Sequence, residues 1–284
     1  MDNKKYTFMA ILAYTIWGLL PIYWRSIINF DSSFVLGIRV ITTFIFTFII
    51  VLYKKPKLYI GIKPLIFTMI SGIFLGINWF LYIFTVNSGN IFEAGLAYYI
   101  SPTLSILIGI IVFKDKKTLL EYISIILMFI GMFYQAITLG KFPIMAFLIG
   151  LTFSIYGVFK KMTLYKALDS LFLETIAMLI PSIILTKIYF PMKYQPIHTW
   201  ILLMFSGIAT AIPLYLYAKA SKELQISTIG FLQFIIPLLA IFIALFVYKE
   251  EINLNRIITL SIIMLSTIIY IISIFKNSFN KLNI

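Results

Sequence analysis

Two charged residues, Arg39 and Glu174, lie inside long apolar segments of this 284-residue chain. If those segments cross a membrane, each charge costs about 2.5–3.5 kcal/mol to insert and needs a compensating group or a function. Facing a cavity, Arg39 could receive an anionic group such as a carboxylate or phosphate, and Glu174 could receive a cation or a proton. Alternatively, each side chain pairs inside the protein or extends toward a membrane interface. The sequence leaves both interpretations open.

Three further polar side chains lie in or beside apolar segments. Asn78 and Gln233 each carry two donors and an acceptor, so hydrogen bonding between helices and contact with a ligand are equally open. Glu93 stands at the expected start of a helix, where the helix dipole stabilises a carboxylate. Capping is the first interpretation of Glu93, and gating is the second.

Aromatic residues make up 17% of the chain, and many must face lipid or form interface belts. A pattern recurs, however: Tyr14 and Trp17 precede a glycine, as Phe153 and Tyr156 do, so each segment presents an aromatic pair on one helix face. For any single ring, ordinary core packing is the simpler explanation. As a group, the rings predict a cavity for a ligand with an apolar or aromatic part. The aromatic candidates are Tyr14, Trp17, Trp79, Tyr82, Tyr98, Tyr156 and Tyr215.

Prolines inside apolar segments are candidate hinges. A proline removes a backbone donor and clashes with the preceding turn, so the helix can kink and expose carbonyl oxygens. Pro102 and Pro237 occupy matching places 135 residues apart, and Pro213 bends a further segment. We predict gating or hinge roles for Glu93, Pro102, Pro213 and Pro237.

The elements that position these residues are membrane helices. The chain is 62% hydrophobic with a mean hydropathy of +1.03, whereas soluble domains are about 45–50% apolar. Apolar runs of about 18–22 residues recur, each able to cross a hydrocarbon core about 30 Å thick, and a β-barrel would instead need short alternating strands. We predict an all-α membrane protein with ten transmembrane helices, over 6–25, 34–53, 64–86, 93–113, 119–139, 143–160, 170–190, 199–220, 227–248 and 256–275.

The ten helices form two copies of one design. Residues of the first half recur in the second at a constant offset of 135, as the following pairs show: Ser71 and Ser206, Gly72 and Gly207, Gly76 and Ala211, Tyr82 and Tyr217, Gly95 and Gly230, Pro102 and Pro237. Five helices per copy is an odd number, so the second copy must be inverted relative to the first. We predict repeats at residues 1–139 and 140–284, with a substrate site between them.

The net charge of +13 carries topological information. With the N-terminus in the cytoplasm, sixteen of the 23 Lys and Arg residues fall on the cytoplasmic side and six on the other. This positive-inside pattern predicts a multi-pass protein of the plasma membrane with both termini cytoplasmic. The basic residues should meet anionic lipid headgroups, and we expect no nucleic-acid partner.

Several chemistries lack their residues. The chain has no cysteine and one histidine, which excludes disulfides and thiolate or multi-histidine metal sites, so we expect neither metal nor cofactor. No nucleotide-binding P-loop is present. A secondary transporter for a small organic metabolite or drug is therefore the leading prediction, with a coupling ion such as H⁺ left open. The alternatives are a membrane-embedded lipid-modifying enzyme and a membrane subunit that does not transport.

The same residues resemble the EamA family of the drug/metabolite transporter superfamily, its RarD branch in particular. The resemblance covers nearly the whole chain and is carried by 13–18 (AYTIWG), 39–41 (RVI), 76–79 (GINW), 93–102 (EAGLAYYISP), 173–175 (LET) and 227–237 (STIGFLQFIIP). It departs at Ile38, where a histidine is expected, and at Ala177, where an aromatic residue is usual. The resemblance implies a ten-helix permease with two inverted EamA-type repeats around a central cavity, working by alternating access. Members of the superfamily move amino acids, nucleotide-type metabolites, sugars and drugs.

Overall fold

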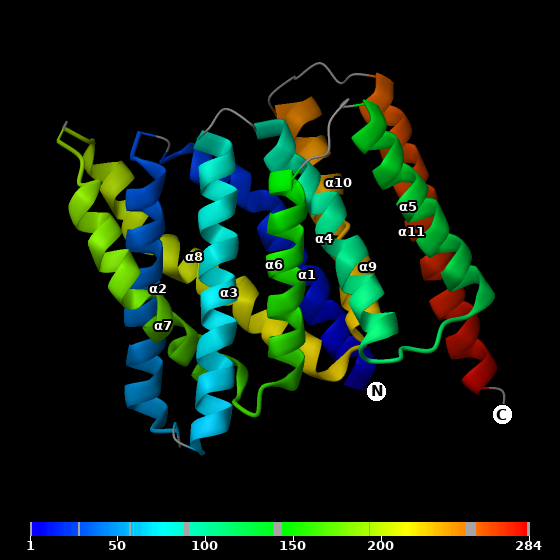
Figure 1. Ribbon diagram of the computed structural model, residues 1–284, viewed down its shortest axis with the longest axis horizontal. Helices are drawn as coiled ribbons and strands as arrows, with labels where there is room; N and C mark the ends of the chain where they lie inside the picture. The colour runs from blue at the N-terminus through cyan, green and yellow to red at the C-terminus, as the bar shows by residue number, and fades with distance from the viewer. Residues whose placement is uncertain are drawn as a thin grey trace.

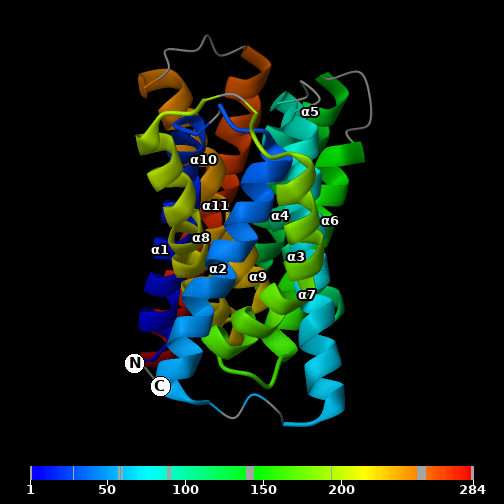
Figure 2. The ribbon, with the colours of Figure 1, turned by 90° about the vertical axis from the view of Figure 1, so that its left-hand side faces the viewer.

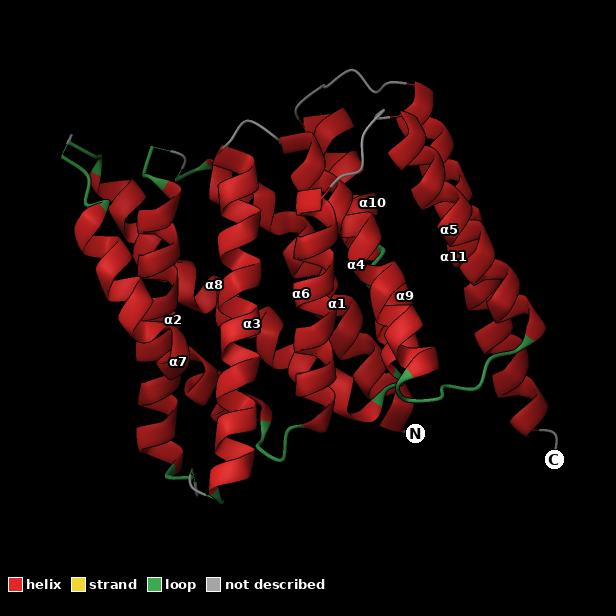
Figure 3. Ribbon diagram, in the orientation of Figure 1, coloured by secondary structure: helices red, strands yellow, loops and turns green. Residues whose placement is uncertain are grey.

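The protein is a bundle of long helices, as a computed structural model shows (Figure 1). The structure describes residues 2–27, 29–56, 58, 60–87, 91–138, 144–192, 194–247 and 254–282, and these contain helices but no strand (Figure 3). The helices are α1 (Asp2–Arg25), α2 (Ser32–Lys54), α3 (Ile62–Asn87), α4 (Ile91–Ile111), α5 (Leu119–Thr138), α6 (Ile144–Met162), α7 (Ala167–Ile188), α8 (Ile197–Glu223), α9 (Ile226–Leu232), α10 (Ile235–Phe242), the π-helix η1 (Ile243–Val247) and α11 (Leu254–Leu282).

Most of these helices can cross a bilayer. Seven helices of the described chain are long and apolar enough to do so, and shorter apolar stretches lie at Ile100–Ile111, Ile226–Leu239 and Ile257–Tyr270. Many large apolar side chains on the outside of the bundle are exposed, as expected of a surface that faces lipid. The prediction of an all-α membrane protein is confirmed.

The two halves run in opposite directions. Both ends of the chain lie at the same end of the bundle, which we call the termini end (Figures 1 and 2). Helix α1 starts at the termini end, whereas α6, the first helix of the second half, starts at the opposite end (Figure 1).

Helix packing repeats this symmetry. Helix α2 packs on its counterpart α7, α5 on α11, and α4 on α9. The other large contacts come in pairs that the repeat exchanges: α2 with α8 and α3 with α7, α1 with α8 and α3 with α6, α4 with α6 and α1 with α10. The two halves are therefore interlocked around a pseudo-two-fold axis, as in transporters with inverted repeats.

Two glycines let the halves interlock closely. A Cβ atom at Gly207 of α8 would lie 2.3 Å from the carbonyl carbon of Thr42 in α2. At the matching Gly72 of α3, a Cβ would lie 2.5 Å from the carbonyl oxygen of Glu174 in α7. Both crossings bring backbone against backbone, which is the packing that small residues permit in membranes.

One predicted helix is interrupted. The sequence suggested a continuous span over 227–248, but α9 ends at Leu232 and α10 begins at Ile235. Pro237 has no N–H for the carbonyl of Gln233 four residues earlier, and its ring clashes with that carbonyl. The Ile236 N–H donates to the Gln233 carbonyl instead, over 3.1 Å, so the chain turns there. Pro102 and Pro213, in contrast, lie inside helices that stay continuous, α4 and α8.

Candidate functional site

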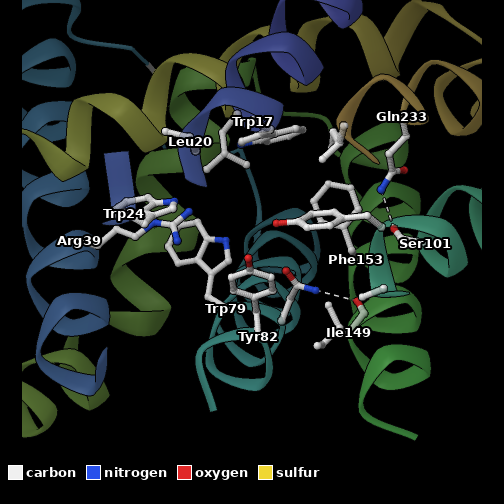
Figure 4. Close-up of a pocket in the computed structure, with 15 residues that line it drawn as sticks. Trp17, Leu20, Trp24, Arg39, Trp79, Tyr82, Ser101, Ile149, Phe153 and Gln233 are labelled. Atoms are coloured by element: carbon white, nitrogen blue, oxygen red, sulfur yellow. Dashed lines mark hydrogen bonds between the residues drawn. The ribbon is translucent and has the colours of Figure 1, made fainter. Parts of the chain in front are cut away.

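A cavity lies between the two halves of the bundle (Figure 4). Its volume is about 120 Å³, which is room for a small organic molecule. Helices α1 to α4 contribute most of the lining, and α6, α8, α10 and the break after α9 contribute the rest. The lining residues are Trp17, Leu20, Trp24, Arg39, Asn78, Trp79, Tyr82, Ala97, Tyr98, Ser101, Ile149, Phe153, Leu214, Gln233 and Ile236.

Arg39 is the cation of this cavity. Its Cζ lies 4.0 Å from the ring centroid of Trp79 and 4.8 Å from that of Trp24 (Figure 4). Its Nε donates to the Thr210 hydroxyl of α8 over 2.7 Å. Among the described residues, no carboxylate lies within 4.0 Å of its guanidinium. Cation–π contacts thus take the place that an ion pair would usually fill.

Two amide side chains supply further polar groups. The Gln233 Nε2 donates to the Ser101 hydroxyl over 2.6 Å, while the buried Gln233 Oε1 has no hydrogen-bond partner among the described residues. The Asn78 Nδ2 donates to the Ile149 carbonyl over 2.7 Å and to the Thr152 hydroxyl over 3.2 Å, which ties α3 to α6. Gln233 lies in the break between α9 and α10, where Pro237 cannot donate to its carbonyl, and its amide lines the cavity.

Five rings pack together beside the cavity, and we call them the aromatic cluster. Its members are Tyr14, Trp17, Phe153, Tyr156 and Tyr217, and contacting rings have centroids 5.6–6.2 Å apart. Trp17 and Phe153 line the cavity, whereas the three tyrosines are buried and lie outside its lining. Because α1 runs away from the termini end and α6 runs toward it, Tyr14 and Tyr156 each lie one turn nearer that end than the cavity rings. The cluster therefore fills the space between the cavity and the termini end.

The structure brings most of the predicted cavity residues together. The cavity lining includes Trp17, Arg39, Asn78, Trp79, Tyr82, Tyr98 and Gln233. The rings of Tyr82 and Tyr98 lie 5.9 Å apart. Sequence reasoning missed Trp24, which follows Trp17 by seven residues and so shares its helix face. It also missed Ser101, whose only signal was its place beside Pro102.

Glu174 lies elsewhere, in an ion pair. Its Oε1 is 2.9 Å from the Nζ of Lys160, and both side chains are at most 1% exposed. The hydroxyls of Ser71 and Ser170 each donate to the same oxygen over 2.9 Å, and Tyr156 donates to Oε2 over 3.5 Å. Lys160 also donates to Ser170 over 2.9 Å. The interpretation in which Glu174 pairs internally is the one that the structure supports, because the carboxylate's acceptor sites meet protein donors.

The remaining candidates lie outside the cavity lining. Tyr14 and Tyr156 belong to the aromatic cluster, and within the described chain the buried Tyr14 hydroxyl has no hydrogen-bond partner. Tyr215 of α8 is half-buried and holds the Lys219 ammonium 5.2 Å from its ring centroid. Glu93 is in the first turn of α4, but its side chain lies outside the part that the structure describes.

The polar groups of the cavity can bind a ligand through charge and hydrogen bonds. They comprise one guanidinium, two carboxamides, two phenols, one serine hydroxyl and the indole N–H groups of three tryptophans. In the described part of the chain, no three His, Asp or Glu side chains are close enough to hold a metal ion.

Comparisons with known proteins agree with this arrangement. The EamA-like transporter family matches at residues 4–135 and again at residues 141–272. The uncharacterized transporter YojE of Bacillus subtilis (strain 168) is 32% identical over 96% of this chain and 95% of its own, and Protein RarD of Escherichia coli (strain K12) is 30% identical over 95% of each. A crystal structure with 15% identity covers 94% of this chain and 97% of its own with a TM-score of 0.74, which shows the fold alone. The chain therefore belongs to the EamA-like transporter family and is a membrane transporter.

Proposed function

We propose that the protein is a secondary transporter that moves a small organic metabolite or drug across the plasma membrane by alternating access. The observation that carries this proposal is the cavity itself, which is bounded by both halves and adjoins a cluster of rings on one side. The repeats at 1–139 and 140–284 would move against each other and open the cavity alternately to either face. A substrate drives such a change only through its differential affinity for the two states.

The aromatic cluster is the proposed gate at the termini end. Its rings come from α1, α6 and α8, so a separation of α1 or α6 from α8 would open the cavity there. Gly157 tightens the closed packing, because a Cβ there would lie 2.6 Å from the Tyr217 hydroxyl. Hinge motion would use the break between α9 and α10, together with the prolines at 102 and 213.

Flux through reconstituted vesicles tests the function. Preloaded vesicles should show counterflow of at least one labelled compound from a panel of amino acids, nucleosides, sugar phosphates and phenicol drugs. Protein-free vesicles are the control, and an imposed pH gradient shows whether H⁺ is coupled. Chemical conversion of a compound without flux would favour the enzyme alternative instead.

The gate predicts a specific change in access. The cysteine-free chain allows a single reporter, Ala97→Cys, in the cavity lining. Adding Tyr217→Ala should raise labelling of this cysteine from the termini side by about tenfold or more, equivalent to about 1.4 kcal/mol in the opening equilibrium. The measurement is the labelling rate with an impermeant thiol reagent. Tyr215→Ala is the matched control on the same helix, and an unchanged rate in Tyr217→Ala would refute the gate.

Sidedness is tested with the same chemistry. Lys55 directly follows the end of α2, and Lys187 is next to the last residue of α7. These two helix ends lie at opposite ends of the bundle (Figure 1), so a single cysteine is placed at each position. We expect the cysteine at position 55 to react only from the cytoplasmic side and that at position 187 only from the outside. Reaction of both from one side would contradict the proposed orientation.

A further inference from the structure

We propose that the cavity binds an organic anion, with its carboxylate or phosphate on Arg39, a small apolar or aromatic body, and a hydroxyl or amino group near Gln233. This inference rests on the proposed function and names the substrate class of the same cavity. Figure 4 shows Arg39 and Gln233 on opposite sides of the cavity.

The two intramembrane charges, Arg39 and Glu174, have different surroundings. Arg39 and Glu174 occupy the same position of the repeat, 135 residues apart. Glu174 has a Lys160 ammonium 2.9 Å away, whereas the described residues provide no carboxylate for Arg39. A lone charge at membrane depth is costly, and intramembrane charges usually serve transport pathways or pair with one another. Arg39 therefore has the features of a charge kept for a ligand.

The Arg39 guanidinium is held mainly by ring contacts. Trp24 and Trp79 contact it through their rings, and among the described residues only the Thr210 hydroxyl accepts a hydrogen bond from it, through Nε. Arginine carries five N–H donors, so the two terminal nitrogens keep theirs for a ligand. A planar fork that is held by stacking matches a carboxylate or phosphate in the bidentate mode.

The side of the cavity opposite Arg39 carries the Gln233 amide. The Gln233 Oε1 is buried and meets no hydrogen-bond donor in the part of the chain that the structure describes, while its Nε2 donates to the Ser101 hydroxyl. Leaving a buried acceptor unsatisfied is costly, so a ligand that donates a hydrogen bond there gains affinity. The remaining lining is mixed: apolar side chains come from Leu20, Ile149, Phe153, Leu214 and Ile236, and polar groups from Asn78, Tyr82 and Tyr98. The small volume of the cavity limits the body to about one ring or a short aliphatic chain.

Binding to the purified protein tests this inference. Three of the four tryptophans line the cavity, so intrinsic fluorescence reports occupancy. The probes are 4-hydroxyphenylacetate and its neutral amide, 4-hydroxyphenylacetamide, with 4-hydroxyphenyl phosphate as a second anion. We expect the better of the two anions to bind at least about tenfold more tightly than the amide, because charge-assisted bidentate hydrogen bonds are the stronger kind.

Variants decide whether Arg39 is responsible. Arg39→Gln should reduce the anion preference to less than about threefold, and Arg39→Lys should keep part of it because the charge remains. Lys54→Gln removes a cation from the exposed end of the same helix and should change nothing. Trp200→Phe, which alters the one tryptophan outside the cavity, should leave the signal intact. Circular dichroism and thermal unfolding show whether each variant is folded.

Several outcomes would overturn the inference. They are equal binding of anion and amide, absence of binding by both anions, or an anion preference that survives in folded Arg39→Gln. Competition by phosphatidylglycerol added to the micelles would assign the site to a lipid headgroup and likewise overturn it. Counterflow of neutral or cationic compounds alone would refute the anion while leaving the transporter function standing.

Discussion

Replacing Lys160 with Met should destabilise the protein by about 3–5 kcal/mol, because it leaves the Glu174 carboxylate buried without its counter-charge. The two side chains are 2.9 Å apart and at most 1% exposed, so water cannot take the place of the lost ammonium. Thermal or denaturant unfolding in detergent measures the effect. Lys161→Met is the matched control, since Lys161 is the half-buried neighbour of Lys160 and donates to the Leu224 carbonyl.

A double variant separates the charge from the packing. Lys160→Met combined with Glu174→Gln removes both charges and should recover much of the lost stability, because no unpaired charge remains. Glu174 also accepts from Tyr156 of the aromatic cluster, so the ion pair supports the proposed gate. A single Lys160→Met variant as stable as Lys161→Met would show that the pair contributes nothing.

Replacing Gly207 with Ala should destabilise the bundle by about 1–3 kcal/mol or more, as overpacking of a close contact does. The new methyl group would lie 2.3 Å from the Thr42 carbonyl carbon and 2.4 Å from the Thr43 nitrogen. Both are backbone atoms, which no rotamer change can move aside, so α8 must separate from α2.

Gly131→Ala is the matched control for this prediction. Gly131 of α5 is buried too, but its added Cβ would meet the side chains of Ile263 and Ile262 at 3.1 and 3.3 Å. Those side chains can shift, so the expected loss is below about 1 kcal/mol. Thermal unfolding of the two variants side by side measures the difference. Similar midpoints would show that the crossing at Gly207 has room to relax.

The membrane fold could be predicted because its signals are local. Each apolar run is long enough to span a bilayer by itself, and the number of runs per repeat decides the inversion. Gly72 and Gly207 recur at the repeat offset, and the structure places both at close backbone crossings, which small residues permit. The helix break at Gln233 could not be predicted from the sequence. Pro102 matches Pro237 in the repeat, and yet α4 continues through Pro102.

The cavity could be predicted in part. Arg39, Asn78 and Trp79 stood out as polar or amphipathic groups at membrane depth, and all three line it. Tyr14 and Tyr156 were expected there too, but each lies one helical turn away from a ring that does line the cavity. A turn moves a side chain by about 5.4 Å along the helix axis, and periodicity alone cannot resolve which turn meets the cavity.

The sequence by itself determined the helices, their pseudo-symmetric duplication and the sign of the charges within them, because hydrophobicity, length and charge are properties of each segment taken alone. Only the tertiary structure decided that the Glu174 carboxylate pairs with Lys160, while the described residues leave Arg39 without a carboxylate. Partner choice depends on how each helix is rotated and how deep it sits against helices distant in the chain. Those quantities are set by long-range packing, and it is packing that turned one of two equivalent charges into a structural pair and left the other facing the cavity.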